Sequence, residues 1–412
     1  MHYDAIILGA GAAGLMCAIA AGARGRRVLL LDHAEAPGKK ILISGGGRCN
    51  FTNLGIAPER FLSQNPHFAR SALARYTQHD FIALVRKHRI PFHEKTLGQL
   101  FCDGSAREIV AMLLAECQAA GVDLRLSAHI ANVTRADHFR VATSLGPFTA
   151  PALVLATGGL SIPKMGATSL AHDLARQFAL PLVPPRPGLV PLTFEGEALS
   201  LMRPLSGLAT QVVATAGKRS FAEAMLFTHR GLSGPAILQA SSYWHDGEPL
   251  TVALAENPLP QLLAAKTSRP NATLRTALSD LLPARLAAAL APGDTPMAQL
   301  RDKTLSDLAA TMRAWRLTPS GTEGYAKAEV TLGGIDTATL DQKTMAAKSV
   351  PGLFAIGEAV DVTGWLGGYN FQWAWASGVA AGQAVSEAVA AGTASTGSTG
   401  STGATGSACP TR

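Results

Sequence analysis

The N-terminal part of the chain consists of a short apolar run, a glycine-rich turn, an alanine-rich segment and a second apolar run. The first run covers Tyr3–Leu8, and the second, Val28–Leu31, ends at Asp32. Short apolar runs are typical of strands that are buried on both faces of a parallel sheet. Since the alanine-rich segment between them has helical spacing, the pattern predicts a strand, a tight turn, a helix and a second strand, in this order.

Later segments follow the same two periodicities. The helical period predicts helices in a polar region around 58–90, at 106–121 and, rich in Ala and Gly, at 371–391. Strands are predicted at 122–133, 138–143 and 148–156. The last of these is a buried strand that runs into a turn at Gly158 and Gly159.

The middle of the chain changes character twice. Five prolines lie within 181–191 and mark a boundary between domains. Residues 189–254 are rich in β-type side chains, 257–318 form short amphipathic segments separated by prolines, and glycine-rich strands return at about 327. This order predicts that an insertion interrupts the N-terminal fold, which then resumes.

Composition limits the class of protein. The chain has 412 residues, of which 47% are hydrophobic and 16% charged, so we expect two or three domains with large cores. The five cysteines have no C-x-x-C or metal-type spacing, which indicates free thiols in a reducing compartment and no metal site. The uncharged stretch 5–23 contains early glycines, which favours a buried strand over a membrane span. We therefore expect a cytoplasmic protein without a membrane segment.

The net charge of +7 allows a nucleic-acid partner, but the basic residues are scattered and form no run interleaved with aromatic side chains. Attraction of an anionic cofactor is the simpler interpretation. We therefore expect no stable nucleic-acid partner, and the sequence gives no prediction of the oligomeric state.

The glycine spacing in the first turn indicates the chemistry of that cofactor. Gly9 permits the tight turn, Gly11 lets the backbone approach a pyrophosphate, and Gly14 allows the helix to lie close to the strand. The helix N-terminus then directs its amides at the phosphates, and Asp32 can accept hydrogen bonds from a ribose. Strand, turn, helix and terminal carboxylate together predict a dinucleotide site, which includes Ala12 in the turn.

Three further segments favour FAD over NAD. Residues 41–53 combine consecutive glycines with polar side chains suited to a diphosphate or a flavin edge. Residues 153–168 form a strand-end turn around Thr157 and Gly158, at which backbone can pass close to a cofactor. In 353–378, Glu358 offers a carboxylate to a sugar hydroxyl, and a glycine turn opens a helix that can face the flavin as it gains negative charge.

The motifs GAGAAGL, PGKKILISGGGRCNFTN, LATGGLSIPKMGAT, FTHRGLSGPAILQAS and the long segment from AEVTLGGID to QWAWASG carry a family resemblance. Over about residues 3–390 the chain resembles the FAD-dependent flavoproteins related to the bile-acid-inducible flavoprotein BaiN, also described as aminoacetone-oxidase-like. The resemblance implies an α/β fold with a Rossmann-type FAD-binding domain, interrupted by a β-barrel-like insert with a small helical subdomain. It also implies that the backbone at Ile130 meets the adenine. The remaining implied FAD contacts are Gly9, Gly11, Gly14, Asp32, Lys40, Ser44, Gly45, Arg48, Asn50, Gly158, Gly357, Glu358, Gly368, Asn370, Phe371 and Gln372.

The expected domains follow from this architecture. Residues 1–186 and 331–392 are expected to form the two parts of the FAD-binding domain. The β-rich insert is expected at 187–256 and 319–330, and the helical subdomain at 257–318. The low-complexity residues 393–412 cannot bury a core and are expected to be disordered.

These features predict an FAD-dependent oxidoreductase that acts on a small organic substrate, with the flavin carrying the hydride. A second dinucleotide fingerprint is absent from the sequence, so NAD(P)H would dock transiently, or oxygen would accept the electrons. Two alternatives remain: a flavin-bound redox sensor or assembly factor, and an FAD-dependent nucleic-acid modification enzyme. The sequence identifies no catalytic residue. His229 could act as an acid or base or could fix the insert, and Cys49 has no partner cysteine nearby in sequence.

Overall fold

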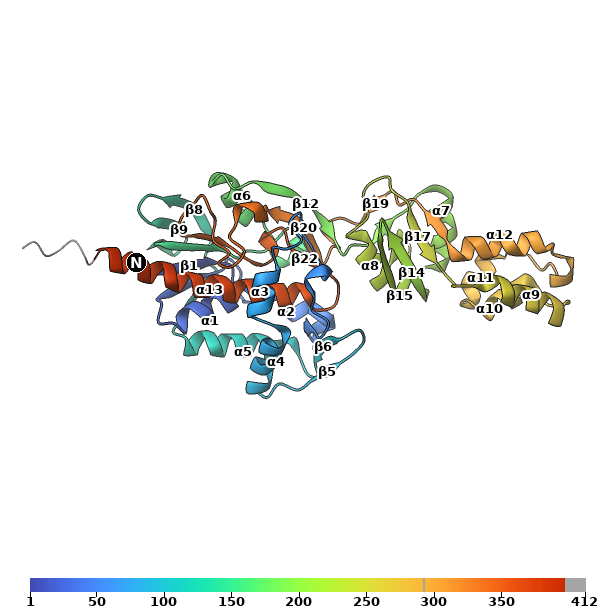
Figure 1. Cartoon of the computed structure of the whole chain (residues 1–412), viewed down its shortest axis with the longest axis horizontal. Coiled ribbons are helices and arrows are strands. Elements are labelled where there is room, and N and C mark those ends of the chain that lie inside the picture. Colours follow the sequence, from blue (N-terminus) through green and yellow to red (C-terminus); the bar gives the residue numbers. More distant parts are fainter. Residues whose placement is uncertain (292, 397–412) are drawn as a thin grey trace, which may run out of the picture.

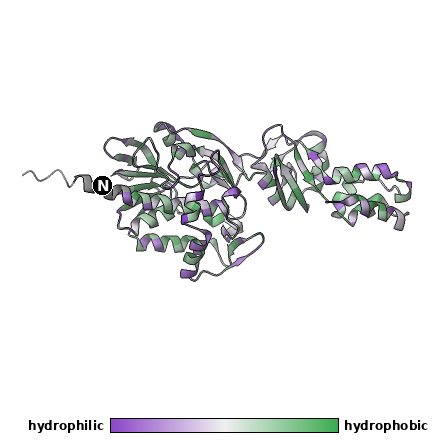
Figure 2. Cartoon of the chain, viewed as in Figure 1, coloured by the Kyte–Doolittle hydropathy of each residue, from purple (hydrophilic) through white to green (hydrophobic). Residues whose placement is uncertain are grey.

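The computed structural model describes residues 1–291 and 293–396, with side chains described up to residue 387. The molecule is elongated (Figure 1): a large α/β body contains the N-terminus, and an insert extends from it, first as a β-sheet and then as a group of helices. Colouring by hydropathy places apolar residues along the sheets of both parts (Figure 2). Within the described residues, no helix is long and apolar enough to cross a membrane.

A parallel sheet in the order β21-β11-β1-β2-β7 forms the centre of the large body. Every residue of β1, β2, β11 and β21 is buried, as the apolar runs in the sequence predict. The strand from the C-terminal part of the chain, β21, pairs with β11, so the segments before and after the insert build one sheet. The strands are β1 (Ala5–Leu8), β2 (Val28–Leu31), β7 (Asp123–Arg125), β11 (Ala152–Leu155) and β21 (Leu353–Ala355).

Two helices pack against each other unusually closely: α1 (Ala12–Gly22) and α13 (Tyr369–Thr396). Gly378 and Gly382 lie one turn apart on α13. A Cβ atom at Gly378 would lie 2.5 Å from the carbonyl oxygen of Ala13, and one at Gly382 would lie 2.5 Å from that of Cys17. The absence of side chains at these two positions therefore sets the distance between the helices.

Smaller elements surround the central sheet. The antiparallel sheets are β10-β9-β8 and β3-β6-β5, and β12 pairs with β20 and β4 with β22. The strands are β3 (Asn50–Asn53), β4 (Phe61–Leu62), β5 (Phe92–Glu94), β6 (Gln99–Cys102), β8 (Ile130–Arg135), β9 (Phe139–Thr143), β10 (Gly146–Ala150), β12 (Leu182–Gly188), β20 (Val330–Ile335) and β22 (Thr363–Gly364). The helices are α2 (Lys39–Ile43), α3 (Arg70–Arg75), α4 (Gln78–Lys87), α5 (Ala106–Ala119) and α6 (Leu170–Gln177).

Two predicted strands are each divided in the structure. The segment 122–133 leaves the parallel sheet after β7, because the backbone amide of Ala128 donates to the carbonyl of Asp32 and Ser127 has a φ of 52°. The chain then enters the antiparallel sheet as β8. The segment 148–156 is divided at Pro151, which separates β10 from β11. Apolar content alone did not reveal these changes of sheet.

The insert has its own sheet, in the order β18-β17-β14-β15-β16-β13-β19, and its own apolar core. Trp365, from the large body, packs against the cores of both parts. The strands are β13 (Leu192–Thr193), β14 (Ala209–Ala216), β15 (Arg219–Thr228), β16 (Gly231–Ser233), β17 (Leu250–Ala253), β18 (Trp315–Leu317) and β19 (Gly321–Thr322). The helices are α7 (Gly196–Met202), α8 (Pro235–Ser241), α9 (Pro258–Ser268), α10 (Leu274–Ser279), α11 (Ala284–Leu290) and α12 (Asp302–Arg313).

The α/β class with a parallel central sheet and an interrupting insert is as predicted. The domain limits themselves stay a prediction. The last helix is longer than its predicted range of 371–391, so 393–396 continue α13 and do not form part of a separate tail. The rest of the predicted disordered tail, 397–412, lies outside the described residues.

Candidate functional site

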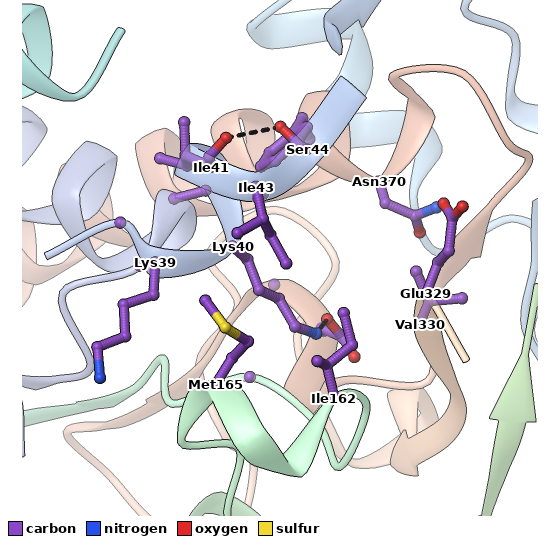
Figure 3. A pocket seen from close by; sticks show the side chains of 18 of the residues that line it. Lys39, Lys40, Ile41, Ile43, Ser44, Ile162, Met165, Glu329, Val330 and Asn370 are labelled. Atoms are coloured by element: carbon purple, nitrogen blue, oxygen red, sulfur yellow. Dashed lines mark hydrogen bonds and ion pairs between the residues drawn. The ribbon is translucent and has the colours of Figure 1, made fainter. Parts of the chain in front are cut away.

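A cavity of about 600 Å³ lies in the large body, where loops after β1, β2, β11 and β21 meet. In parallel α/β sheets, ligands bind at this carboxyl edge of the strands. Figure 3 shows the cavity between α2, the turn that holds Met165, and β20 with the start of α13. Its volume lies in the range of small-molecule and cofactor sites.

The first glycine turn supplies a phosphate-binding surface. Gly9 has a φ of 107°, and a Cβ there would lie 2.4 Å from the carbonyl oxygen of Ala156. At Gly14 a Cβ would lie 1.8 Å from the carbonyl oxygen of Gly9, so this glycine is required for helix α1 to approach the strand. Gly11 differs, since its backbone is extended and no protein atom lies within 4 Å of a Cβ built on it. The protein does not require glycine at position 11, but a ligand in front of the helix N-terminus would.

Asp32 holds this turn from the end of β2. Its two carboxylate oxygens accept hydrogen bonds from the backbone amides of Ala10, at 2.7 Å, and of Ala34, at 2.8 Å. These bonds fix the carboxylate at the cavity wall while leaving further acceptor capacity on both oxygens. The position fits the predicted contact with a ribose.

The second glycine loop follows α2 and forms another part of the wall. Gly45 and Gly46 have φ values of 57° and 67°, and a Cβ at Gly45 would lie 2.7 Å from the ring of Phe101. The hydroxyl of Ser44 donates to the carbonyl of Ile41 at 2.7 Å (Figure 3). This loop therefore offers backbone groups to a ligand, while the Ser44 hydroxyl caps its own helix.

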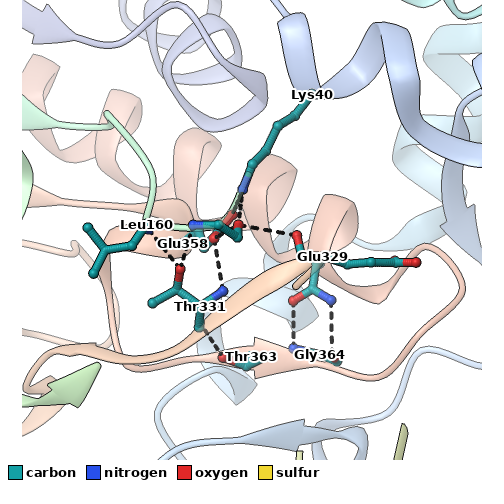
Figure 4. A network of polar contacts seen from close by, with 9 residues as sticks. Lys40, Leu160, Glu329, Thr331, Glu358, Thr363 and Gly364 are labelled. Atoms are coloured by element: carbon teal, nitrogen blue, oxygen red, sulfur yellow. Dashed lines mark hydrogen bonds and ion pairs between the residues drawn. The ribbon is translucent and has the colours of Figure 1, made fainter. Parts of the chain in front are cut away.

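An ion pair joins two parts of the chain that are far apart in sequence (Figure 4). Lys40 Nζ lies 2.7 Å from Glu358 Oε2 and donates to Ser161 Oγ at 2.5 Å. The other carboxylate oxygen, Glu358 Oε1, accepts from Ser161 Oγ at 2.8 Å and from the amide of Thr331 at 3.0 Å. Burial by itself would raise the pKa of Glu358, but Lys40 and these donors hold it below its ordinary value. Glu358 is therefore ionised at neutral pH and connects α2, β20 and the loop after β21.

We expect Glu358→Gln to destabilise the protein at neutral pH by about 1–2 kcal/mol. Hydrogen bonds to charged groups contribute about 1.5–3 kcal/mol, and Lys40 is 34% exposed, which screens the pair. Because the pKa of Glu358 is lowered on folding, its contribution is present above the ordinary carboxyl pKa and is lost as the pH falls through the folded-state pKa. Urea unfolding at a series of pH values measures this. A difference from wild type in the free energy of unfolding that persists at the lowest pH values would contradict the ion-pair explanation. Glu59→Gln, which removes the carboxylate of the exposed pair of Glu59 and Arg70, is the control.

The opposite end of the cavity is formed by the start of α13 and by the glycine turn before it. Gly368 has a φ of 95°, and a Cβ there would lie 2.4 Å from the carbonyl oxygen of Thr52. The side chain of Asn370 bonds the backbone of Gly364 in both directions, at 2.8 and 2.9 Å (Figure 4). Asn370 therefore fixes the loop 364–368 in addition to lining the cavity.

The insert contacts the same loop from its other side. The amide of Leu366 donates to Gln239 Oε1 at 3.1 Å, and the indole nitrogen of Trp365 donates to the hydroxyl of Tyr243 at 2.7 Å. Gln239 belongs to α8 of the insert, and Leu366 lines the cavity. The insert is thus attached directly to one wall of the site.

The residues that line the cavity fit FAD. Cβ atoms at Gly11, Gly46 and Gly158 would point into open space, and the N-terminus of α1 faces that space. The buried hydroxyl of Thr157 also lines the cavity and has no hydrogen-bond partner within the described residues. Open backbone and an unsatisfied hydroxyl at a phosphate-type turn are what a diphosphate and its sugars would occupy.

Most of the predicted contact residues come together at this cavity. Those that line it are Gly9, Gly11, Ala12, Asp32, Lys40, Ser44, Gly45, Asn50, Thr157, Gly158, Gly357, Glu358, Gly368, Asn370 and Phe371. Gly14 lies behind the turn, as described above. Three others lie apart from the cavity: Arg48 is exposed, Ile130 is in β8, and Gln372 is fully buried with its amide bonded to Thr52 and Tyr76. Contact of any of these residues with FAD stays a prediction.

The structure adds residues to the site that the motifs did not indicate. Gln99 and Phe101 of β6, Leu189 after β12, and Glu329 before β20 all line the cavity. They come from three separate segments. Gln99, Phe101 and Leu189 belong to none of the family motifs, and AEVTLGGID contains Glu329 without any local signal for a place in the site. His229 is exposed on the turn after β15 and does not line the cavity.

We expect Cys49→Ser to keep FAD and a substantial part of its reduction and reoxidation. Cys49 is buried, and burial raises the pKa of its thiol to about 12, so little reactive thiolate is present at neutral pH. Pairing of β3 with β6 brings Cys102 close, but both thiols are free. Absorbance of the flavin during reduction and reoxidation measures the outcome. A variant that binds FAD normally but no longer turns over would make Cys49 a catalytic thiol.

Comparison with known proteins places these features in context. Residues 3–384 match the family described as "HI0933-like protein Rossmann domain". The chain is 51% identical over 395 residues to the ribosomal RNA dihydrouridine synthase of Escherichia coli (strain K12), covering 93% of this chain and 98% of that protein. It is 28% identical over 408 residues to the 3-dehydro-bile acid delta(4,6)-reductase of Clostridium scindens, covering 92% and 98%. A solved 3-ketosteroid-delta4-(5alpha)-dehydrogenase from Rhodococcus jostii RHA1 shares the fold, with a TM-score of 0.50, 15% identity and coverage of 93% and 97%.

Proposed function

Because the chain belongs to the HI0933-like family of FAD-binding Rossmann proteins, we propose that it is an FAD-dependent enzyme that reduces a uridine base of ribosomal RNA to dihydrouridine. The observation that carries this proposal is the extent of the similarity. The relative with this activity in its name aligns with 93% of the chain, so the alignment includes both the cofactor-binding body and the insert. Family membership also confirms the predicted FAD cofactor and oxidoreductase class.

The proposal follows the predicted alternative, nucleic-acid modification, and replaces the predicted main function on a small substrate. Formation of dihydrouridine adds a hydride to one carbon of the C5=C6 bond of uracil and a proton to the other. Bound FAD supplies the hydride when it has been reduced. The chain then has to hold the base over the cofactor, exclude water and provide the proton.

The residues of the cavity divide these tasks between its two ends. The turn of Gly9 and Gly11 with Asp32 would hold the diphosphate and the adenosine ribose. The glycine loop at 44–46 and the loop 364–368 would enclose the flavin end. There the positive end of the α13 dipole favours negative charge on the ligand. The apolar side chains of Phe101, Leu189 and Leu366 would exclude water from this end.

The distribution of charge supports an RNA substrate. Residues 58–107, which include α3, α4 and the β5–β6 hairpin, hold eight Lys and Arg side chains and four Asp and Glu side chains. Arg86, Arg89 and Lys95 in this segment are exposed, and the hairpin also supplies Gln99 and Phe101 to the cavity wall. Exposed basic side chains on a segment that also lines the cavity can contact phosphates next to the target base.

A second candidate function is reduction of a small unsaturated carbonyl compound. It is favoured by the relative named as a bile acid reductase, which aligns over 92% of this chain, and by the apolar side chains around the flavin end. The higher identity to the protein named for ribosomal RNA makes the nucleic-acid substrate the first choice.

The two candidates are separated by product analysis. Protein loaded with FAD is incubated without oxygen with NADH or NADPH and with unmodified ribosomal RNA transcripts. The RNA is digested to nucleosides, and mass spectrometry measures uridine that has gained two hydrogen atoms. We expect dihydrouridine in the wild-type reaction and none without FAD. Reduction of a panel of enones, with ribosomal RNA unchanged, would support the second candidate instead.

A further inference from the structure

Three carboxylate side chains line the cavity, and within the described part of the chain only one of them has no protein partner. Asp32 accepts two backbone amides, and Glu358 is paired with Lys40 and accepts two further hydrogen bonds. The carboxylate of Glu329 takes part in no hydrogen bond or ion pair among the described residues. Structural roles therefore account for Asp32 and Glu358 but not for the side chain of Glu329.

The backbone fixes the position of Glu329. Its amide donates to the carbonyl of Leu189 at 3.2 Å, and its carbonyl accepts from Ser161 Oγ at 3.3 Å. Figure 4 shows its side chain directed away from the ion pair of Lys40 and Glu358. Figure 3 shows it near Asn370, at the end of the cavity formed by α13. Glu329 is thus at the end of the cavity formed by α13, where the substrate would meet the cofactor.

The surroundings of Glu329 favour its protonated form. The residue as a whole is exposed, but the protein atoms around its carboxyl raise the pKa of that group above its ordinary value, and no cationic partner is found among the described residues. The charged or titratable side chains on elements packed against β20 are Arg186 on β12, Glu358 on the short 3-10 helix Gly357–Ala359, and His172, Asp173 and Arg176 on α6. Those that line the cavity itself are Asp32, His33, Lys39, Lys40 and Glu358. Lys40, the nearest cation of the network, is neutralised by Glu358.

We propose that Glu329 is the proton donor for reduction of the substrate double bond. This inference rests on the proposed function and assigns the catalytic acid for it. One carbon of the C5=C6 bond receives the hydride that the cofactor supplies, and the other receives the proton from the Glu329 carboxyl. The double bond becomes a single bond, and Glu329 is left as a carboxylate that regains a proton from water. Two electrons and two protons in total enter the base, in balance with the product.

The same carboxyl group would serve either substrate class. In uracil and in an enone, the carbon–carbon double bond is conjugated with a carbonyl. Hydride addition to one carbon therefore leaves negative charge on the other carbon and on the carbonyl oxygen, and a proton must neutralise it. A carboxyl group with a raised pKa and no protein partner among the described residues is suited to this transfer. The cysteines of the described residues are buried thiols and none lines the cavity, so the acid cannot be a thiol.

The test compares Glu329→Gln and Glu329→Asp with wild type and with Glu197→Gln, an exposed carboxylate on the insert. Four quantities are measured: bound FAD with its absorbance spectrum, affinity for the ribosomal RNA transcript, the rate of flavin reduction by NAD(P)H, and the rate of reoxidation by the RNA. We expect Glu329→Gln to keep the first three and to slow reoxidation by about 100-fold or more, the usual contribution of a general acid. Glu329→Asp should recover part of the rate.

The pH dependence gives a separate readout. Reoxidation by wild type should slow as the pH rises through the pKa of Glu329, since only the protonated form donates. The rate profile of Glu329→Gln should lack this pH-dependent step. The pH titration of this variant's flavin absorbance in the absence of RNA should lack it as well. Equal reoxidation rates and profiles for Glu329→Gln and wild type would overturn the role of Glu329 alone. Absence of dihydrouridine with wild-type protein would overturn the proposed function. Glu329 would then keep its role only if Glu329→Gln slowed reoxidation by an enone to the same extent.

Discussion

Gly11→Val is expected to give a folded protein that binds no FAD. The Cβ direction at Gly11 has no protein atom within 4 Å, and its backbone is extended, so valine is compatible with the fold itself. The two added methyl groups would instead fill the space in front of the N-terminus of α1, where the diphosphate would lie. Flavin absorbance after reconstitution and gel filtration measures binding, and circular dichroism with thermal unfolding of the apoprotein measures folding.

Gly11→Ala provides the graded control, because a single methyl group takes up less of the same space. We expect it to bind FAD more weakly than wild type and more strongly than the valine variant. A yellow Gly11→Val protein with wild-type flavin content would show that the diphosphate does not pass this glycine. An unfolded Gly11→Val apoprotein would show that the space is needed by the protein and not by the ligand.

The double substitution Gly378→Val and Gly382→Val is expected to produce the largest loss of stability of any change considered. Cβ atoms at both positions would lie 2.5 Å from carbonyl oxygens of α1, and backbone cannot move aside as a flexible side chain can. Overpacking of a core usually costs about 1–3 kcal/mol for each site, so a loss of several kcal/mol is expected here. Because α1 carries the phosphate turn at its N-terminus, the displaced helix should also lose FAD.

Urea unfolding and flavin content measure this effect, and Ala83→Val on the exposed face of α4 controls for placing valine in a helix. The control should change the free energy of unfolding by only a few tenths of a kcal/mol. If the double variant unfolded at the same urea concentration as the control, the closeness of α1 and α13 would not depend on the two glycines.

The first part of the site could be predicted because its chemistry is contiguous in the sequence. A strand, a turn with glycines at defined positions, a helix and Asp32 occupy about 30 residues, and each glycine has a local reason to be there. The long helix α13 and the central strands could also be predicted from the sequence, because buried strands and helices each have a characteristic spacing of apolar residues. The same logic led to Gly357, Glu358 and Gly368, which lie directly after a buried strand or before a helix.

The rest of the site depends on contacts between segments that are distant in the sequence, and local sequence patterns do not predict such contacts. The partner of Glu358 is Lys40, 318 residues away, and the pairing follows from the order in which β21, β11 and β1 assemble. Phe101 belongs to no motif, and Glu329 lies in the motif AEVTLGGID without a local signal for its place in the site. Gln372 lies within a strongly predicted motif, but its position on α13 directs the amide into the core toward Thr52. A helix of known extent is not enough to say which of its faces meets the ligand.

The bond between Leu366 and Gln239 has a thermodynamic consequence. The loop 364–368 is a wall of the cavity and is at the same time held by α8 of the insert. Any ligand whose affinity depends on the position of this loop must therefore change the free energy of the insert's attachment, and the attachment must change the ligand's affinity by the same amount. Occupancy of the cavity and attachment of the insert are, on this account, reciprocal variables of a single equilibrium.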